Sequence, residues 1–205
     1  VRNPNPKTIE IYNAIQRATE QKDEAKRNEL KSKLFYFTPA VFVNGARRYS
    51  CINHWTGLMP LDFDKINFAD EFRDYLVAEY PFIIAAWLSS SKFGVRALAR
   101  IPVVSSVDEY KALYYGMRDT LGGYNGFDMA PQNCVLPLFL SYDADIKINE
   151  DAELFTTLGE DFKSIKFAIP QDYRPVEKSH GKLKYIEKGL MTGIAKIHDN
   201  GHPQL

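Results

Sequence analysis

Short apolar stretches separated by amphipathic ones outline the fold. The stretches at 57–64, 81–90, 95–103 and 135–143 predict four strands, and helical spacing of apolar residues predicts helices over 68–80 and 106–121. The second helix begins at a capping box formed by Ser106 and Glu109, and it ends at Gly122-Gly123. The order β-α-β-β-α-β is that of a ferredoxin-like domain, so we predict an α+β fold.

This topology also predicts which segments meet. In the usual strand order, 4-1-3-2, the first strand lies between the fourth and the third and is antiparallel to both. The end of the first strand, at Asp64, is therefore expected beside residues 94–96 and beside the strand that begins just after Asp128. Both helices are expected on one face of the sheet, which leaves the other face open for a ligand.

The two ends of the chain are expected to lie outside this core. Residues 7–34 predict one charged helix, 34–44 an extended segment interrupted by Pro39, and 45–50 a turn with two adjacent arginines. The acidic residues 141–153 predict a surface loop. The lysine-rich segment 163–188 predicts a solvated helix, with a nucleic-acid contact as the alternative. We divide the chain into an N-terminal helix and extended segment (1–57), a central domain (58–147) and a C-terminal helical or linker segment (148–205).

Two aspartates in the first predicted strand are the first candidates for chemistry. Successive side chains of a strand point to opposite faces, so Asp62 and Asp64 share a face, with Cα atoms about 6–7 Å apart. Their oxygens can converge on one hard cation. An isolated pair of this kind is most often a solvated strand face, so other residues have to support a site.

Further polar residues are expected at the same end of the sheet. Asp128 lies in a Gly/Asn/Pro-rich loop, where an aspartate is usually a turn residue, but the topology brings it beside Asp64. The turn 89–92 offers hydroxyls, amides and an ammonium that suit phosphate. Arg96 is expected on the same face as the acids, where a simple salt bridge is an equal alternative. Asp143 is expected at the opposite end of the fourth strand and is therefore not counted as a metal ligand.

Composition excludes some classes of protein. The chain has 205 residues, with 26 Lys and Arg against 26 Asp and Glu, which argues against an indiscriminate nucleic-acid coat but allows a local basic groove. Its two cysteines, Cys51 and Cys134, form no disulfide framework and suit a reducing cytoplasm. We find no signal peptide and no apolar run that would span a bilayer. We take the chain, as a hypothesis, to be one domain of a longer polypeptide.

Several short motifs, in order, resemble those of a known family. They are LDFD at 61–64, S-x-S-x-x-G at 89–94 with a basic residue after it, FD at 127–128, and a strand ending SYD at 141–143. Together they are similar to the primase-polymerase domains of bacterial mobile elements and phages, the VirE N-terminal-like group of the archaeo-eukaryotic primase superfamily. The resemblance covers roughly residues 30–147, and it implies that residues 58–147 form an RRM-like catalytic palm.

The resemblance implies an activity and the residues that carry it. The activity is template-dependent nucleotidyl transfer in the replication of a mobile element, plasmid or phage, with Mg²⁺ or Mn²⁺ as cofactor. The implied partners are a single-stranded DNA template, NTPs or dNTPs, and a helicase domain in the same or another polypeptide. The implied catalytic and metal-binding residues are Asp62, Asp64 and Asp128. The implied nucleotide-binding residues are Ser89, Ser91, Lys92, Gly94 and Arg96.

Three positions depart from the pattern of that family. Arg96 stands where the wider superfamily has histidine and the mobile-element group often has lysine. Lys92 replaces the group's usual glycine, and Leu136 replaces its usual arginine. Two other classes of function therefore stay open. One is a module that binds nucleic acid or nucleotide without catalysis beside a replicative helicase. The other is an interaction domain in which the acids only pair with Arg96 and Arg100.

Overall fold

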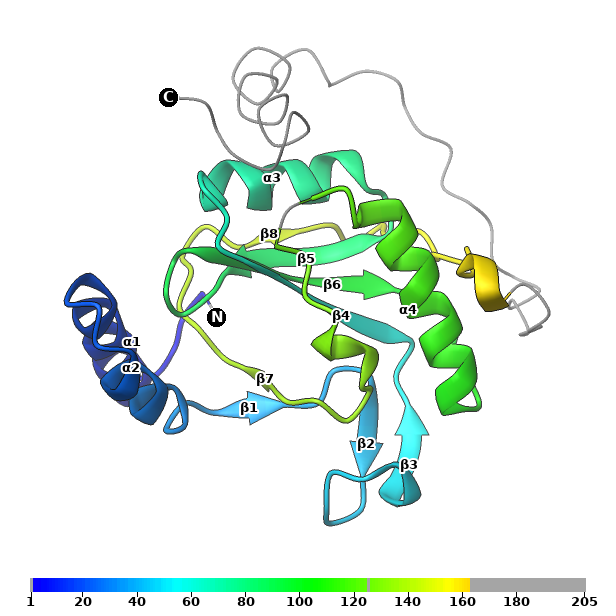
Figure 1. The fold of residues 1–205 in the computed structure, drawn as a ribbon, viewed down its shortest axis with the longest axis horizontal. Helices are drawn as coiled ribbons and strands as arrows, with labels where there is room; N and C mark the ends of the chain where they lie inside the picture. Colours follow the sequence, from blue (N-terminus) through cyan, green and yellow to red (C-terminus); the bar gives the residue numbers. More distant parts are fainter. Residues whose placement is uncertain (1, 125, 163–205) are drawn as a thin grey trace.

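The fold is an antiparallel sheet with helices on one face and two small strand pairs beside it (Figure 1). A computed structural model describes residues 2–124 and 126–162. Its elements are α1 (Pro6–Glu20), α2 (Glu24–Lys31), β1 (Tyr36–Phe37), β2 (Val41–Val43), β3 (Ile52–Trp55), β4 (Leu58–Asp64), α3 (Ala69–Glu79), β5 (Ile83–Leu88), β6 (Gly94–Arg100), α4 (Val107–Leu121), β7 (Leu138–Phe139) and β8 (Lys147–Ile148), with 3-10 turns at Tyr49–Cys51, Ala130–Gln132 and Glu160–Phe162. The predicted α+β class is confirmed. Within the described ranges, no helix is long and apolar enough to cross a membrane.

The main sheet has the strand order β4-β6-β5-β8. Its core lies on the face that α3 and α4 cover, where Phe72 and Leu113 from the helices join Phe63 of β4 in one buried cluster. The alternating small residues of β6 lie beneath these helices, as their spacing predicted. At the start of α4, the Ser106 side chain accepts the Glu109 N–H at 3.2 Å, so the predicted N-cap is present. The Glu109 carboxylate accepts the Ser105 N–H at 2.7 Å rather than the Ser106 N–H, so the capping box is not closed as predicted.

The N-terminal region differs from the single helix predicted over 7–34. It forms two helices, because Lys22 adopts a left-handed conformation (φ 56°) and Asp23 caps α2 by accepting the Lys26 N–H at 2.9 Å. The helices fold back on each other and bury Ile15 against Leu30 in a small cluster of their own. The apolar residues that looked sparse on one helix therefore serve as the core of a helix pair.

The prediction of a fourth strand over 135–143 is wrong for most of its length. Only Leu138–Phe139 forms a strand, and it pairs with β1 rather than with β4. Pro137 precedes it and has no N–H for a ladder, which explains why a longer central strand does not form here. The place beside β4 is taken instead by residues 126–128, through a bridge between Phe63 and Phe127.

The second face of the sheet is less open than expected. Trp87 of β5 is only 2% exposed and packs with Ala85 and Leu138, because the chain around β7 crosses this face. On the β4 side of this face, Asp64 is exposed and Asp62 half-buried.

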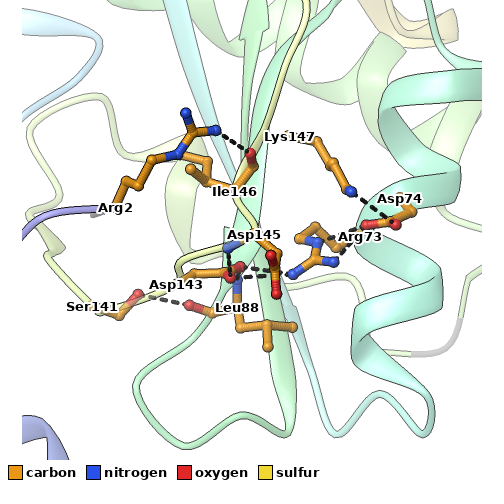
Figure 2. A network of polar contacts seen from close by, with 9 residues as sticks. All are labelled: Arg2, Arg73, Asp74, Leu88, Ser141, Asp143, Asp145, Ile146 and Lys147. Atoms are coloured by element: carbon orange, nitrogen blue, oxygen red, sulfur yellow. Dashed lines mark hydrogen bonds and ion pairs between the residues drawn. The ribbon is translucent and has the colours of Figure 1, made fainter.

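Residues 141–148 were predicted as a surface loop, but they also attach the outer edge of the sheet, at β5, to α3 (Figure 2). The Asp143 carboxylate lies 3.1 Å from Arg73 of α3 and accepts the Leu88 N–H of β5 at 2.8 Å. Lys147 lies 3.2 Å from Asp74. β8 then pairs with β5 and completes the four-stranded sheet.

Candidate active site

The three candidate acids meet at one end of the main sheet. Asp62 and Asp64 share a face of β4, as the alternation of a strand requires. The Asp128 N–H donates to the Asp62 carbonyl at 2.9 Å, and the Asp64 N–H donates to the Gly126 carbonyl at 2.8 Å. This short antiparallel bridge sets Asp128 opposite Asp62, and such cross-strand Cβ atoms are about 4.5–5.5 Å apart. The loop 126–128, rather than a fourth strand, brings the third acid into place.

Two glycines allow the backbone to close around Asp64. A Cβ on Gly94 of β6 would lie 2.6 Å from the Phe63 carbonyl oxygen. Gly126 has φ +96°, and a Cβ there would lie 2.0 Å from the Asp64 carbonyl oxygen. Because any other residue would collide with backbone, these glycines permit the close approach that gathers the acids.

Arg96 of β6 lies directly opposite Asp62 of β4 and forms an ion pair with it. The Arg96 Nε lies 3.5 Å from Asp62 Oδ2, and Arg96 Nη1 donates to the Phe139 carbonyl. The pair is imperfect. Asp62 Oδ1 and Arg96 Nε are buried, yet neither has a hydrogen-bond partner among the described residues. Unpaired buried polar atoms are rare in native proteins and call for a specific cause, such as a ligand-binding role.

The environment of Asp62 favours its protonated form. Burial raises the pKa of its carboxyl to about 6. The guanidinium of Arg96 opposes this shift, and the negative charges of Asp64 and Asp128 add to it. A carboxyl with this pKa changes charge close to neutral pH, where a bound cation would displace its proton.

The serine turn between β5 and β6 stands beside the acids. The Ser89 N–H donates to the Gly94 carbonyl at 2.8 Å, and the Ser89 and Ser91 hydroxyl oxygens are 3.1 Å apart. Lys92 is exposed and has φ 64°, in the left-handed region that favours glycine. Lys92 is thus exposed and Ser91 half-buried at the same end of the sheet as Asp64, whereas Ser89 is buried.

Sequence reasoning missed two residues of the helix pair that contribute to this site. Lys31, the last residue of α2, has its pKa lowered, chiefly by burial and then by the charges of Arg96 and Arg27. Asp62 and Asp64 are close enough to oppose that shift. Gln16 of α1 donates to the carbonyl of Ser90 in the serine turn. No motif marks these residues, and only the folding back of α2 on α1 brings them here.

Some expected residues lie elsewhere. Arg100 is exposed and donates to the Ala152 carbonyl at 2.8 Å, away from the acids. Asp143 was expected at the opposite end of the sheet, and this is wrong. Its contact with Leu88, which pairs with Val95, puts it at the same end as Asp64 but on the outer edge of β5. Leu136 lies in the segment just before β7.

The acids do not yet form a metal cage. In the part of the chain that the structure describes, no group of three or more His, Cys, Asp or Glu side chains is placed to hold a metal ion. Arg96 engages Asp62, and Asp128 Oδ1 accepts the Ala130 N–H at 2.9 Å. The donor set nevertheless fits a hard cation, because it offers carboxylate oxygens and one buried oxygen, Asp62 Oδ1, without a partner. Binding would require the side chains of Asp64 and Asp128 to rotate toward Asp62.

Comparisons with known proteins assign the chain to a family. No curated protein and no solved structure matches it. The family model of the BT4734-like, N-terminal domain matches residues 29–146. That range is more than half of the chain and includes the three acids, the serine turn and Lys31, whereas α1 precedes it. The chain therefore belongs to the BT4734-like N-terminal domain family.

Proposed function

We propose that this protein is a primase-polymerase domain that joins nucleotides on a single-stranded DNA template with the help of Mg²⁺ or Mn²⁺. One observation carries the proposal: Asp62 and Asp64 of β4 and Asp128 of the loop 126–128 meet at one end of the sheet, next to a serine turn, and a buried oxygen of Asp62 has no hydrogen-bond partner among the described residues. The order of motifs that resembles the mobile-element primase-polymerases supports the same activity.

Each part of the site has a role in this proposal. Asp62, Asp64 and Asp128 would hold the divalent ions, and these ions supply charge neutralisation for the attacking and leaving oxygens of phosphoryl transfer. The hydroxyls of Ser89 and Ser91, the ammonium of Lys92 and the bare backbone at Gly94 would hold the triphosphate. Arg96 would leave Asp62 and turn its Nε, which has no hydrogen-bond partner among the described residues, toward a phosphate oxygen.

A second candidate is a binding module without catalysis. The observation that favours it is the Asp62–Arg96 ion pair, which neutralises one acid inside the site. In such a module the same end of the sheet would hold nucleic acid or nucleotide for an adjoining replicative helicase. The pairing of acids with Arg100, by contrast, has no support in the structure, because Arg100 contacts the Ala152 carbonyl.

De novo primer synthesis separates these candidates. Purified protein is incubated with single-stranded DNA, labelled nucleotides and Mn²⁺, and the products are resolved on a denaturing gel. We expect products from the wild type and none from Asp62→Ala/Asp64→Ala. The matched control is Asp108→Ala/Asp151→Ala, which removes two exposed acids outside the site and is expected to keep wild-type activity.

The other outcomes are equally informative. Products from both the wild type and Asp62→Ala/Asp64→Ala would indicate a contaminating polymerase and leave the proposal without support. No product from the wild type, combined with intact template binding, would favour the binding module.

A further inference from the structure

Exposed aromatic side chains gather on the strands that precede the main sheet. The β1–β3 arm, residues 35–55, carries Phe35, Tyr36, Phe42 and Tyr49, each at least 45% exposed. In Figure 1 the paired strands β2 and β3 project away from the main sheet, and β1 and β7 run between them and the helix pair. Large exposed aromatics at this density mark a binding surface rather than ordinary surface composition.

The charge of this region is one-sided. The whole chain has a net charge of zero, yet residues 30–61 contain no Asp or Glu. Within the arm itself, residues 35–55, the formally charged side chains are Arg47 and Arg48. The aromatic surface is therefore basic, and its charge complements a polyanion.

Cationic and aromatic groups are stacked on the arm. The Arg47 guanidinium lies over the Tyr36 ring, 5.0 Å from its centroid. The Phe42 and His54 rings are stacked, with centroids 6.0 Å apart and planes at 22°. Tyr36, Phe42 and Arg47 also line one pocket of about 440 Å³. Flat rings, a guanidinium plane and a concave space in one place suit the face of a nucleobase with its phosphate.

The arm is continuous with the candidate active site. The Tyr36 ring packs edge-on against Phe139, with centroids 5.8 Å apart. The carbonyl of Phe139 accepts the Nη1–H of Arg96, which pairs with Asp62. A strand lying along the arm would thus lead from the Phe42 pocket, past Tyr36 and Phe139, to the acids.

We propose that the β1–β3 arm binds single-stranded DNA, with bases stacked on Tyr36 and Phe42 and the backbone neutralised by Arg47. This inference deepens the proposed function and rests on it, because the bound strand would be the template delivered to the acids. A protein partner is the less suitable occupant, because the formal charges of the arm are all positive, which is what neutralisation of a phosphate backbone requires.

Direct binding tests this inference. Fluorescence anisotropy with a labelled 30-nucleotide dT strand is measured in EDTA and without nucleotide, so that catalysis plays no part. Because bases stack on aromatic side chains, we expect Tyr36→Ala/Phe42→Ala to raise Kd by about tenfold or more. Tyr36→Phe keeps the ring and is expected to keep the wild-type Kd. Arg47→Ala should reduce the slope of log K against log salt concentration by about 0.7, the contribution of one phosphate contact to a single strand.

Matched controls separate the arm from general effects. Phe68→Ala removes an aromatic ring that is 58% exposed at the start of α3, outside the arm, and should leave Kd unchanged. Arg17→Ala, the control for Arg47→Ala, removes an exposed arginine of α1 outside the arm and should leave the salt slope unchanged. Far-ultraviolet circular dichroism and thermal melts establish that each variant is folded.

The outcomes distinguish this inference from the proposed function. Wild-type Kd in Tyr36→Ala/Phe42→Ala, or no binding of the strand by the wild type, would overturn the arm as a DNA site. Loss of self-association in that variant without a change in Kd would make the arm a protein interface instead. If Asp62→Ala/Asp64→Ala binds DNA normally and the wild type makes no primers, the catalytic proposal fails while the arm stands.

Discussion

Two Asp–Arg pairs, one buried and one partly buried, lie at the same end of the sheet and differ in how completely their hydrogen-bonding groups are satisfied. In the Asp143–Arg73 pair the side chains are 4% and 6% exposed, and both carboxylate oxygens are within 3.2 Å of Arg73. The Asp143 oxygens also accept the N–H groups of Leu88 and Asp145. In the Asp62–Arg96 pair the one contact is 3.5 Å long, and Asp62 Oδ1 and Arg96 Nε have no hydrogen-bond partner among the described residues.

The difference separates a structural ion pair from a candidate ligand site. A buried pair stabilises a fold only when good geometry and further hydrogen bonds compensate for the lost hydration of both charges. Asp143 meets that condition and fastens residues 141–148 to α3 and β5. Asp62 does not meet it, so its burial costs stability, and a bound cation would relieve that cost.

The largest expected effect is the loss of the structural pair. Asp143→Ala leaves the buried Arg73 with Asp74 at 2.7 Å and leaves the Leu88 N–H without its acceptor, so it should lower the free energy of unfolding by about 3 kcal/mol. Asp62→Ala should cost no more than about 1–2 kcal/mol, because it also removes a poorly solvated carboxylate. Urea unfolding measures both. Equal losses in the two variants would contradict the comparison, and Asp143→Ala/Arg73→Met should recover part of the loss.

The pH dependence of stability tests the strain at Asp62. Its folded-state pKa of about 6 lies above the ordinary value of 3.8, so the native state holds the proton more tightly than the unfolded chain. Its contribution to stability is full below pH 3.8 and is lost as pH rises through 6. The wild type should lose roughly 2–3 kcal/mol more than Asp62→Asn between pH 4 and 7. Denaturant unfolding at several pH values measures this difference, and parallel curves for the two proteins would refute it.

The assembly of the three acids depends on a glycine. Gly126→Ala would bring a Cβ to 2.0 Å from the Asp64 carbonyl at a positive φ, so residues 126–128 should separate from β4. We expect a loss of roughly 2 kcal/mol in unfolding free energy and an Asp62 pKa closer to its ordinary value. Gly123→Ala is the control, because a Cβ there meets nothing within 4 Å. Equal stability of the two variants would show that the close approach is not required.

The smallest effect concerns the helix pair. Lys31→Met removes a positive charge that lowers the Asp62 pKa, so that pKa should rise by a few tenths of a unit. Lys33→Met is the control, since Lys33 pairs with Glu29 at 2.6 Å. Carbon-13 NMR titration of the Asp62 carboxyl measures both variants. An unchanged Asp62 pKa in Lys31→Met would show that Lys31 does not contribute to the site.

Local pattern determined the parts of this protein that depend on neighbours in sequence. Short apolar stretches identified β4, β5 and β6, and helical spacing identified α3 and α4, with a capping serine at the start of α4. The spacing of Asp62 and Asp64 put them on one face, and the antiparallel pairing of β4 with β6 put Gly94 and Arg96 beside them. These features follow from periods of two and 3.6 residues, which the chain carries wherever it folds.

Only the tertiary structure decided what depends on distant contacts. Strand pairing is one such feature, since β7 pairs with β1, β8 with β5, and residues 126–128 with β4. Which segment pairs with which strand edge depends on all the segments that compete for that edge, and no local pattern in the sequence records this. The turn at Lys22 folds α2 back so that Lys31 approaches the acids. Likewise, sequence made Asp143 and Asp62 look like similar surface or strand acids. Burial and hydrogen-bond partners, which are properties of the packed chain, made one of them a structural clamp and left the other with an unpaired oxygen.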